Sequence, residues 1–146
     1  DEWDTTLAVN LTAPFKLTRA AIPHLLEANG AVVNVTSCAA FMGQAYLAAY
    51  SSTKAALTHM TKSLAMEYMH KPIRINAVAP GGMMTALATG LKNLKNPDPS
   101  LLERIAPLRG MVEIEQVADM VVFLATDAAS GYHGACINID NGITAG

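Results

Sequence analysis

Charged and aromatic side chains are scarce in this 146-residue chain. Asp, Glu, Lys and Arg make up 15% of the residues and aromatic residues 5%, whereas 51% are hydrophobic. A chain with so little charge and so many apolar residues is not intrinsically disordered, and it has enough material for one buried core. The net charge of −2 gives no electrostatic basis for binding nucleic acid or an anionic membrane.

The sequence also lacks long apolar runs and a leader. No run approaches the roughly 20 residues that a membrane-spanning helix requires, and no basic-then-apolar segment opens the chain. We therefore expect a cytoplasmic protein. The chain starts at Asp1 without an initiating methionine and enters a helical pattern at once, so we interpret it as a fragment of a longer protein.

Cysteine is rare as well. Cys38 and Cys136 are the two cysteines, and they form neither a disulfide framework nor a metal-binding spacing. We predict two buried thiols in a reducing compartment and no metal site.

Three short apolar runs alternate with long helical patterns. The predicted strands are 31–36, 73–79 and 135–139, and the predicted helices are 2–28, 46–69 and 114–126. Strands joined by crossovers of this length run parallel, and the first strand–helix–strand unit should be right-handed. The predicted fold class is α/β: the C-terminal part of a doubly wound, Rossmann-type parallel sheet, with about three parallel strands and flanking helices. Residues 1–146 form a single partial domain.

The two long helical patterns carry more apolar surface than one sheet can cover. Pro14 and Pro23 should bend or divide the pattern at 2–28, because each removes a backbone donor. The pattern at 46–69 is apolar over more than one stripe, which predicts burial against a sheet and a second surface. A partner subunit is the simplest second surface.

A long irregular stretch, residues 83–109, follows Pro80-Gly81-Gly82 at the end of the second strand. Ligands bind at the carboxyl ends of strands in open α/β sheets, and glycines there let a ligand approach the backbone. A plain turn is the alternative interpretation of the glycines. We predict a substrate loop at about 83–109.

A hydroxyl, a phenol and an ammonium follow the first strand. Ser37 ends that strand, Tyr50 lies 13 residues later, and Lys54 is four residues beyond Tyr50, on the same helical face. Such a group suits proton transfer, because a nearby cation should lower the pKa of the phenol. Asn10 lies within the first helical pattern, where a buried amide needs a hydrogen-bond partner; a solvent-facing or capping asparagine is the alternative interpretation.

Taken together, these residues resemble the short-chain dehydrogenase/reductase family over essentially the whole chain. The matching stretches are EWDTTLAVNL, VVNVTS, YSSTKAAL, RINAVAPG with the following MMT, ADMVVFLATDAAS and IDNG. The resemblance implies that Asn10, Ser37, Tyr50 and Lys54 are the catalytic tetrad. It also implies two groups of cofactor contacts. One consists of Tyr50 and Lys54. The other is the segment from Asn76, with contacts at Pro80, Gly81, Met83 and Thr85.

The resemblance further implies an NAD or NADP cofactor and a homodimer or homotetramer formed through the helices at 2–28 and 46–69. The family's Gly-rich phosphate turn and its cofactor-selecting residue would lie before position 1, so NAD and NADP are not distinguished. Asp140-Asn141-Gly142 stands where the family commonly has Asp-Gly-Gly.

The function that we predict is interconversion of a carbonyl and a secondary alcohol by hydride transfer, with Tyr50 as general acid/base. The substrate is a small molecule, and the Leu and Met residues of 83–109 indicate a partly apolar one. Two alternatives stay open: a non-catalytic Rossmann-fold binding or scaffold module, and an inactive fragment of the enzyme.

Overall fold

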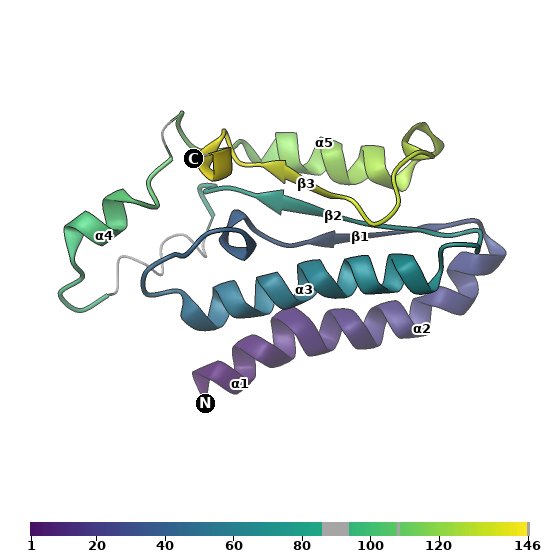
Figure 1. The fold of residues 1–146 in the computed structure, drawn as a ribbon, viewed down its shortest axis with the longest axis horizontal. Coiled ribbons are helices and arrows are strands. Elements are labelled where there is room, and N and C mark those ends of the chain that lie inside the picture. The colour runs from purple at the N-terminus through teal and green to yellow at the C-terminus, as the bar shows by residue number, and fades with distance from the viewer. Residues whose placement is uncertain (86–93, 108, 146) are drawn as a thin grey trace.

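A computed structural model describes residues 1–85, 94–107 and 109–145, with helices on both faces of a three-stranded parallel sheet (Figure 1). The strands are β1 (Ala31–Val35), β2 (Arg74–Pro80) and β3 (Cys136–Ile139), in the spatial order β1-β2-β3. Their register pairs Val35 with Val78 and Pro80 with Ile139. The predicted fold class, with three parallel strands, is confirmed.

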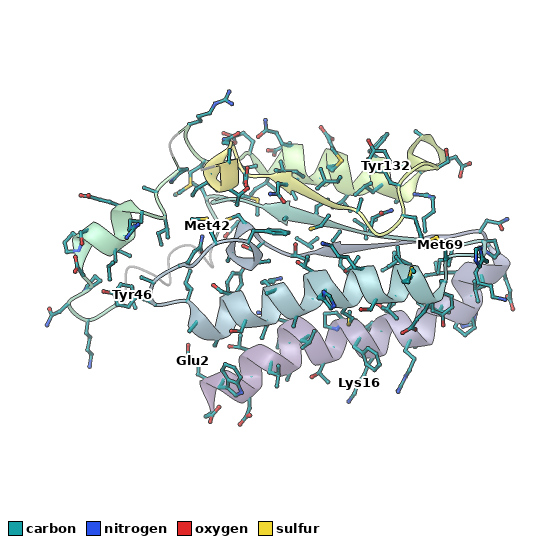
Figure 2. All side chains as sticks on the ribbon, viewed as in Figure 1. Glu2, Lys16, Met42, Tyr46, Met69 and Tyr132 are labelled. Atoms are coloured by element: carbon teal, nitrogen blue, oxygen red, sulfur yellow. The ribbon has the colours of Figure 1, made fainter. Side chains whose placement is uncertain are left out.

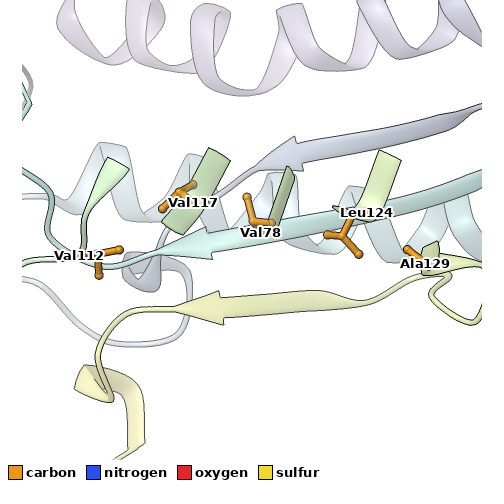
Figure 3. Close-up of a cluster of buried hydrophobic side chains, with 5 residues drawn as sticks. All are labelled: Val78, Val112, Val117, Leu124 and Ala129. Atoms are coloured by element: carbon orange, nitrogen blue, oxygen red, sulfur yellow. The ribbon is translucent and has the colours of Figure 1, made fainter. Parts of the chain in front are cut away.

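The central strand, β2, is buried on both faces, because a neighbour lies on each edge and helices cover both sides. Ile75 packs with Ile22 and Ala65 on the side of the two long helices. Val78 packs on the opposite side with Leu124 in the cluster drawn in Figure 3. This two-sided burial explains why the strand, apart from Arg74 and Asn76, is apolar on both faces rather than alternating.

The two crossover helices lie on opposite faces of the sheet. Helix α3 (Ala48–Glu67) joins β1 to β2 on one face, and α5 (Ile114–Ala125) joins β2 to β3 on the other (Figure 1). Because the strands advance in one direction across the sheet, the two crossovers have opposite hands. One of the two crossovers therefore departs from the usual right-handed rule. The second connection also carries α4 (Pro99–Glu103).

The predicted helix at 2–28 is continuous in direction but changes type. It comprises α1 (Glu2–Leu7), a π-helical turn η1 (Ala8–Thr12) and α2 (Ala13–Glu27). The change comes just before Pro14, which lies in the first turn of α2, where its missing N–H is tolerated. Pro23 lies inside α2 without ending it, so the helix is not divided at Pro23.

The short elements lie mainly near the carboxyl ends of the strands. They are η2 (Cys38–Ala40), α4, η4 (Asp127–Ala129) and η5 (Ile143–Ala145). Asp98 caps α4 by accepting a hydrogen bond from the Ser100 N–H. Part of the predicted substrate loop, including Leu87 and Leu91, lies outside the described residues. Among the residues described, no helix has both the length and the apolar character needed to span a bilayer.

Candidate active site

Ser37 lies where the chain leaves β1 and turns into η2. Its extended backbone caps η2, and its hydroxyl accepts a hydrogen bond from Ala39 N at 3.2 Å. The side chain is almost fully buried. The hydroxyl is therefore held by local backbone geometry at the carboxyl edge of the sheet, as predicted from its position after the strand.

Tyr50 and Lys54 stand one turn apart at the start of α3. The Lys54 ammonium lies over the Tyr50 ring, 5.7 Å from the ring centroid. It also donates a hydrogen bond to the carbonyl of Val35, the last residue of β1, at 2.9 Å. The helix thus brings the two side chains back to the strand end beside Ser37.

The pKa of Tyr50 differs from the value expected from sequence. Burial raises the pKa of the phenol, interaction with the Ser37 hydroxyl lowers it in part, and the Cys38 thiol adds a smaller upward shift. The expected lowering by Lys54 is wrong for this arrangement, because desolvation dominates. Burial also lowers the pKa of Lys54, so both groups favour their neutral forms more than they would in water.

Asn10 reaches the site indirectly. It lies in the π turn η1, and its amide nitrogen donates a hydrogen bond to Oγ1 of Thr53 at 3.2 Å. The same Thr53 hydroxyl donates to the backbone carbonyl of Tyr50 at 2.8 Å. Thr53 is a residue that sequence reasoning missed; its place in the stretch YSSTK, directly before Lys54, was the available signal.

The loop after β2 is packed against the end of β3. Gly81 N donates to the Ile139 carbonyl at 2.9 Å, and a Cβ on Gly81 would lie 2.8 Å from Asp140 Cα. Gly81 is therefore required for close packing of two backbone segments, a role that the sequence did not suggest. Thr85 N closes a turn onto the Met83 carbonyl at 2.9 Å.

The side chain of Asn76 has a structural role in holding the turn that precedes β3. Its amide donates to the Tyr132 carbonyl at 2.8 Å and accepts from Ala135 N at 3.0 Å. Both ends of this fully buried amide are occupied by backbone of the turn before β3, so Asn76 fixes that turn rather than presenting a group to a ligand.

A cavity of about 370 Å³ lies between the loop after η2 and the helix α4. It is lined by Met42, Gly43, Ala45, Leu101, Arg104 and Ile105. Tyr46 links the same two segments, because its hydroxyl accepts a hydrogen bond from Asp98 N at 2.8 Å. Met42 and Tyr46 lie at the end of the molecule that carries α4 (Figure 2).

Cys38, directly after Ser37, is buried. Burial raises the pKa of its thiol, and Gln44 contacts the sulfur at 3.6 Å. A protonated, buried thiol is a poor nucleophile. The prediction of a buried thiol is confirmed for Cys38, whereas Cys136, also predicted to be buried, is only half-buried.

Comparison with known proteins identifies the family of this chain and agrees with its fold. The profile of the family described as enoyl-(acyl carrier protein) reductase matches residues 1–144. Trans-4-hydroxycyclohexanecarboxylate dehydrogenase from Sinomonas cyclohexanicum is 35% identical over 146 residues, covering 100% of this chain and 53% of that protein. The chain belongs to the short-chain dehydrogenase/reductase family.

Solved structures agree with this membership. Gluconate 5-dehydrogenase from Burkholderia cenocepacia, in complex with NADP and tartrate, superposes with a TM-score of 0.87 at 25% identity, covering 100% of this chain and 57% of that one. 4-Hydroxyisoleucine dehydrogenase complexed with NADH gives a TM-score of 0.81 at 29% identity, covering 99% and 60%. The chain therefore spans a little over half the length of these members of the family.

Asn141, where the short-chain dehydrogenase/reductases commonly have glycine, adopts a left-handed backbone with φ 52°. Asparagine tolerates this region better than other non-glycine residues. Its amide also donates to the carbonyls of Gly110 and Met111, both at 3.1 Å. Asparagine at this position thus adds two hydrogen bonds between the segment after β3 and the segment that leads into α5.

Proposed function

We propose that the protein containing this chain is an NAD(P)-dependent oxidoreductase that interconverts a carbonyl and a secondary alcohol. The observation that carries the proposal is the clustering of Ser37, Tyr50 and Lys54 at the carboxyl end of β1, with the Lys54 ammonium 5.7 Å from the Tyr50 ring centroid. These are three of the four residues that the sequence predicted. The fourth, Asn10, joins them through Thr53.

Tyr50 acts as the general acid/base. Reduction of a carbonyl builds negative charge on oxygen, and that oxygen needs a proton as the charge forms. Burial raises the pKa of Tyr50, so the phenol is held protonated until the charge that develops on the substrate oxygen draws the proton away. Ser37 orients the substrate oxygen with its hydroxyl and stabilises the developing charge.

The donor groups of the site fit the nicotinamide end of NAD or NADP. The Lys54 ammonium and the Tyr50 hydroxyl suit the vicinal hydroxyls of a ribose, since both can donate to sugar oxygens. Pro80, Gly81, Met83 and Thr85 would hold the carboxamide end. When bound, the nicotinamide supplies or accepts the hydride, and the NADP and NADH complexes of the two structural neighbours support either cofactor.

Lys54 has a second task in this scheme. Its ammonium donates to the Val35 carbonyl at 2.9 Å, so it is anchored at the strand end and available beside Tyr50. The half-buried Lys54 ammonium lies beside the phenolate that remains after Tyr50 gives up its proton, and a neighbouring cation favours that anion. In the resting site burial is the largest influence on the pKa of Tyr50, and it acts in the opposite direction.

The cavity between the loop after η2 and α4 supports a partly apolar substrate. Most of its lining side chains are apolar or small, and Arg104 adds one guanidinium. We propose that α4, which is part of the predicted loop at 83–109, covers the substrate there. The substrate panel to test includes 3-oxoacyl thioesters, steroids, sugars and small ketones.

We also propose that two copies pack through the helical layer formed by α1, η1, α2 and α3. A shallow hollow on its outer side is lined by Leu11, Thr12, Phe15, Ala56, His59 and Met60. Its polar and charged content is low, as expected of a surface covered by a second subunit. A non-catalytic scaffold would have no use for the clustering of Ser37, Tyr50 and Lys54 at one strand end, so we rank that alternative lower.

The decisive experiment is Tyr50→Phe in the full-length protein that contains this chain. The substitution removes the proton donor and leaves the ring, so kcat should fall by roughly 10²–10⁴-fold while cofactor affinity changes little. Turnover is followed by NADH or NADPH absorbance with the substrate panel. Tyr68→Phe, the same change at the other end of α3, is the matched control. Full activity in Tyr50→Phe would rule out the proposed mechanism.

A further inference from the structure

The loop after β2, residues 80–85, lies against the turn after β3, residues 139–144. Gly81 N donates to the Ile139 carbonyl at 2.9 Å, and a Cβ on Gly81 would lie 2.8 Å from Asp140 Cα. The two backbones are therefore in direct contact, with no side chain between them. The position of the loop on this side depends on the position of the turn.

A second stretch of backbone, the entry segment (residues 110–112), leads into α5 and contacts the same loop. The Gly82 carbonyl accepts a hydrogen bond from the N–H of Val112, a buried residue, at 2.9 Å. A Cβ on Gly82 would lie 3.1 Å from Sδ of Met111. The loop after β2 is thus held by two neighbours that come from different parts of the chain.

Asn141 joins these two neighbours to each other. It lies in the turn after β3, and its Nδ2 donates to the carbonyls of Gly110 and Met111 in the entry segment, both at 3.1 Å. Each of the three segments therefore contacts the other two. A residue without a side-chain donor at position 141 would leave the loop between two neighbours that these bonds no longer connect.

The turn that carries Asn141 is itself held by a buried carboxylate. Oδ1 of Asp140 accepts from Gly142 N at 2.9 Å, and Oδ2 accepts from Thr144 N at 3.3 Å and from the Thr144 hydroxyl. These bonds fix the backbone on both sides of Asn141. The Asn141 amide is thus presented from a fixed turn, so its two hydrogen bonds restrain the entry segment.

We propose that Asn141 is a positioning residue for cofactor binding, because it ties the entry segment to the turn after β3 and so fixes the loop between them. This proposal rests on the proposed oxidoreductase function, which assigns the loop to the carboxamide end of NAD or NADP. Thr85 N donates to the Met83 carbonyl at 2.9 Å, so these two residues form a turn directly after Gly82 and move with it. A loop that is already ordered binds a ligand more tightly, since less conformational freedom is lost on binding.

The experiment compares Asn141→Gly and Asn141→Asp in the full-length protein. Glycine tolerates the left-handed backbone and removes the donor, whereas aspartate keeps the shape but cannot donate to the two carbonyls. The dissociation constant is measured by fluorescence titration for whichever of NADH and NADPH the parent binds more tightly. It should rise about three- to tenfold in both variants, which corresponds to the net contribution of one hydrogen bond. At saturating cofactor kcat should change by less than about twofold, because the catalytic side chains are untouched.

Two controls separate positioning from stability. Asn29→Gly makes the same substitution at an exposed residue with φ 50°, and it should leave the dissociation constant unchanged. Thr61→Val removes a fully buried hydroxyl of α3, so it should lower the melting temperature without changing cofactor affinity. Hydrogen exchange of the Val112 amide reports on its bond to Gly82 and should be faster in Asn141→Gly but not in Thr61→Val.

Parent-like cofactor affinity in both Asn141 variants would overturn the proposal, as would an equal loss of affinity in Asn141→Gly and Thr61→Val. If Asn141→Asp does not fold, Asn141→Gly and its controls give the same comparison. If the parent saturates with cofactor and Tyr50→Phe is inactive, such a result removes only the role of Asn141. If the parent binds neither NADH nor NADPH, the proposed function fails and the role of Asn141 fails with it.

Discussion

Asn141 combines a backbone conformation that favours glycine with two hydrogen bonds that glycine cannot form. Its φ is 52°, and its amide donates to the carbonyls of Gly110 and Met111. Asn29 has nearly the same backbone, with φ 50°, but it is exposed at the end of α2. Substitutions at Asn141 and Asn29 can therefore be compared to separate the energetic effect of the left-handed backbone from that of the side-chain hydrogen bonds.

We expect Asn141→Gly to lower the free energy of unfolding by about 1–2 kcal/mol. Two hydrogen bonds are lost, and this loss outweighs the lower backbone strain of glycine at positive φ. Asn141→Ala should cost more, since alanine at positive φ adds strain. Asn29→Gly should be neutral. Urea unfolding followed by circular dichroism measures all three, and equal stability of Asn141→Gly and the parent would show that the two bonds contribute nothing.

At the scale of elements, α2 and α3 leave an apolar hollow on the side that faces away from the sheet. Phe15 is 44% exposed in this hollow, and the Arg19 guanidinium lies 5.8 Å from the centroid of its ring. Large exposed apolar side chains grouped on one face indicate an interface. The proposed occupant is the same hollow on a second copy.

Phe15→Glu in the full-length protein should shift the assembly towards the monomer, because an unpaired carboxylate would be buried against apolar side chains. Sedimentation velocity measures the distribution. Ala20→Glu, which introduces the same charge at an exposed position of α2 outside the hollow, should leave it unchanged. Identical sedimentation of Phe15→Glu and the parent would exclude this surface as the subunit contact.

At the scale of the whole molecule, the chain covers 53% of the dehydrogenase from Sinomonas cyclohexanicum and 57% of the gluconate 5-dehydrogenase structure. In the part of the chain that the structure describes, β1 pairs with β2 on one edge, and no strand pairs with its other edge. An open edge of this kind invites pairing with a further strand. We propose that the isolated chain holds only one end of the cofactor.

Residues 1–146 alone should therefore bind NADH and NADPH weakly. Cofactor fluorescence titrated with the isolated chain should show little saturable change, whereas the full-length protein should saturate. Circular dichroism confirms that the isolated chain is folded in the same buffer. Tight, saturable binding by the isolated chain would show that this half is sufficient for the cofactor.

The sequence by itself determined the parallel α/β fold and the places of Ser37, Tyr50 and Lys54. Apolar runs of strand length, separated by long helices, allow few other topologies. A spacing of four on a helix brings Tyr50 and Lys54 together whatever surrounds them. These properties are local, so they could be predicted from neighbouring residues.

Only the tertiary structure decided the opposite hands of the two crossovers, the packing role of Gly81 and the pKa of Tyr50. Each depends on contacts between residues distant in sequence: α5 against the far face of the sheet, Gly81 against Asp140, and the desolvation of Tyr50 by its surroundings. The link from Asn10 through Thr53 to Tyr50 is of the same kind, since it spans 43 residues. Burial and long-range hydrogen bonds are set when the elements pack, which is why residue spacing alone does not predict them.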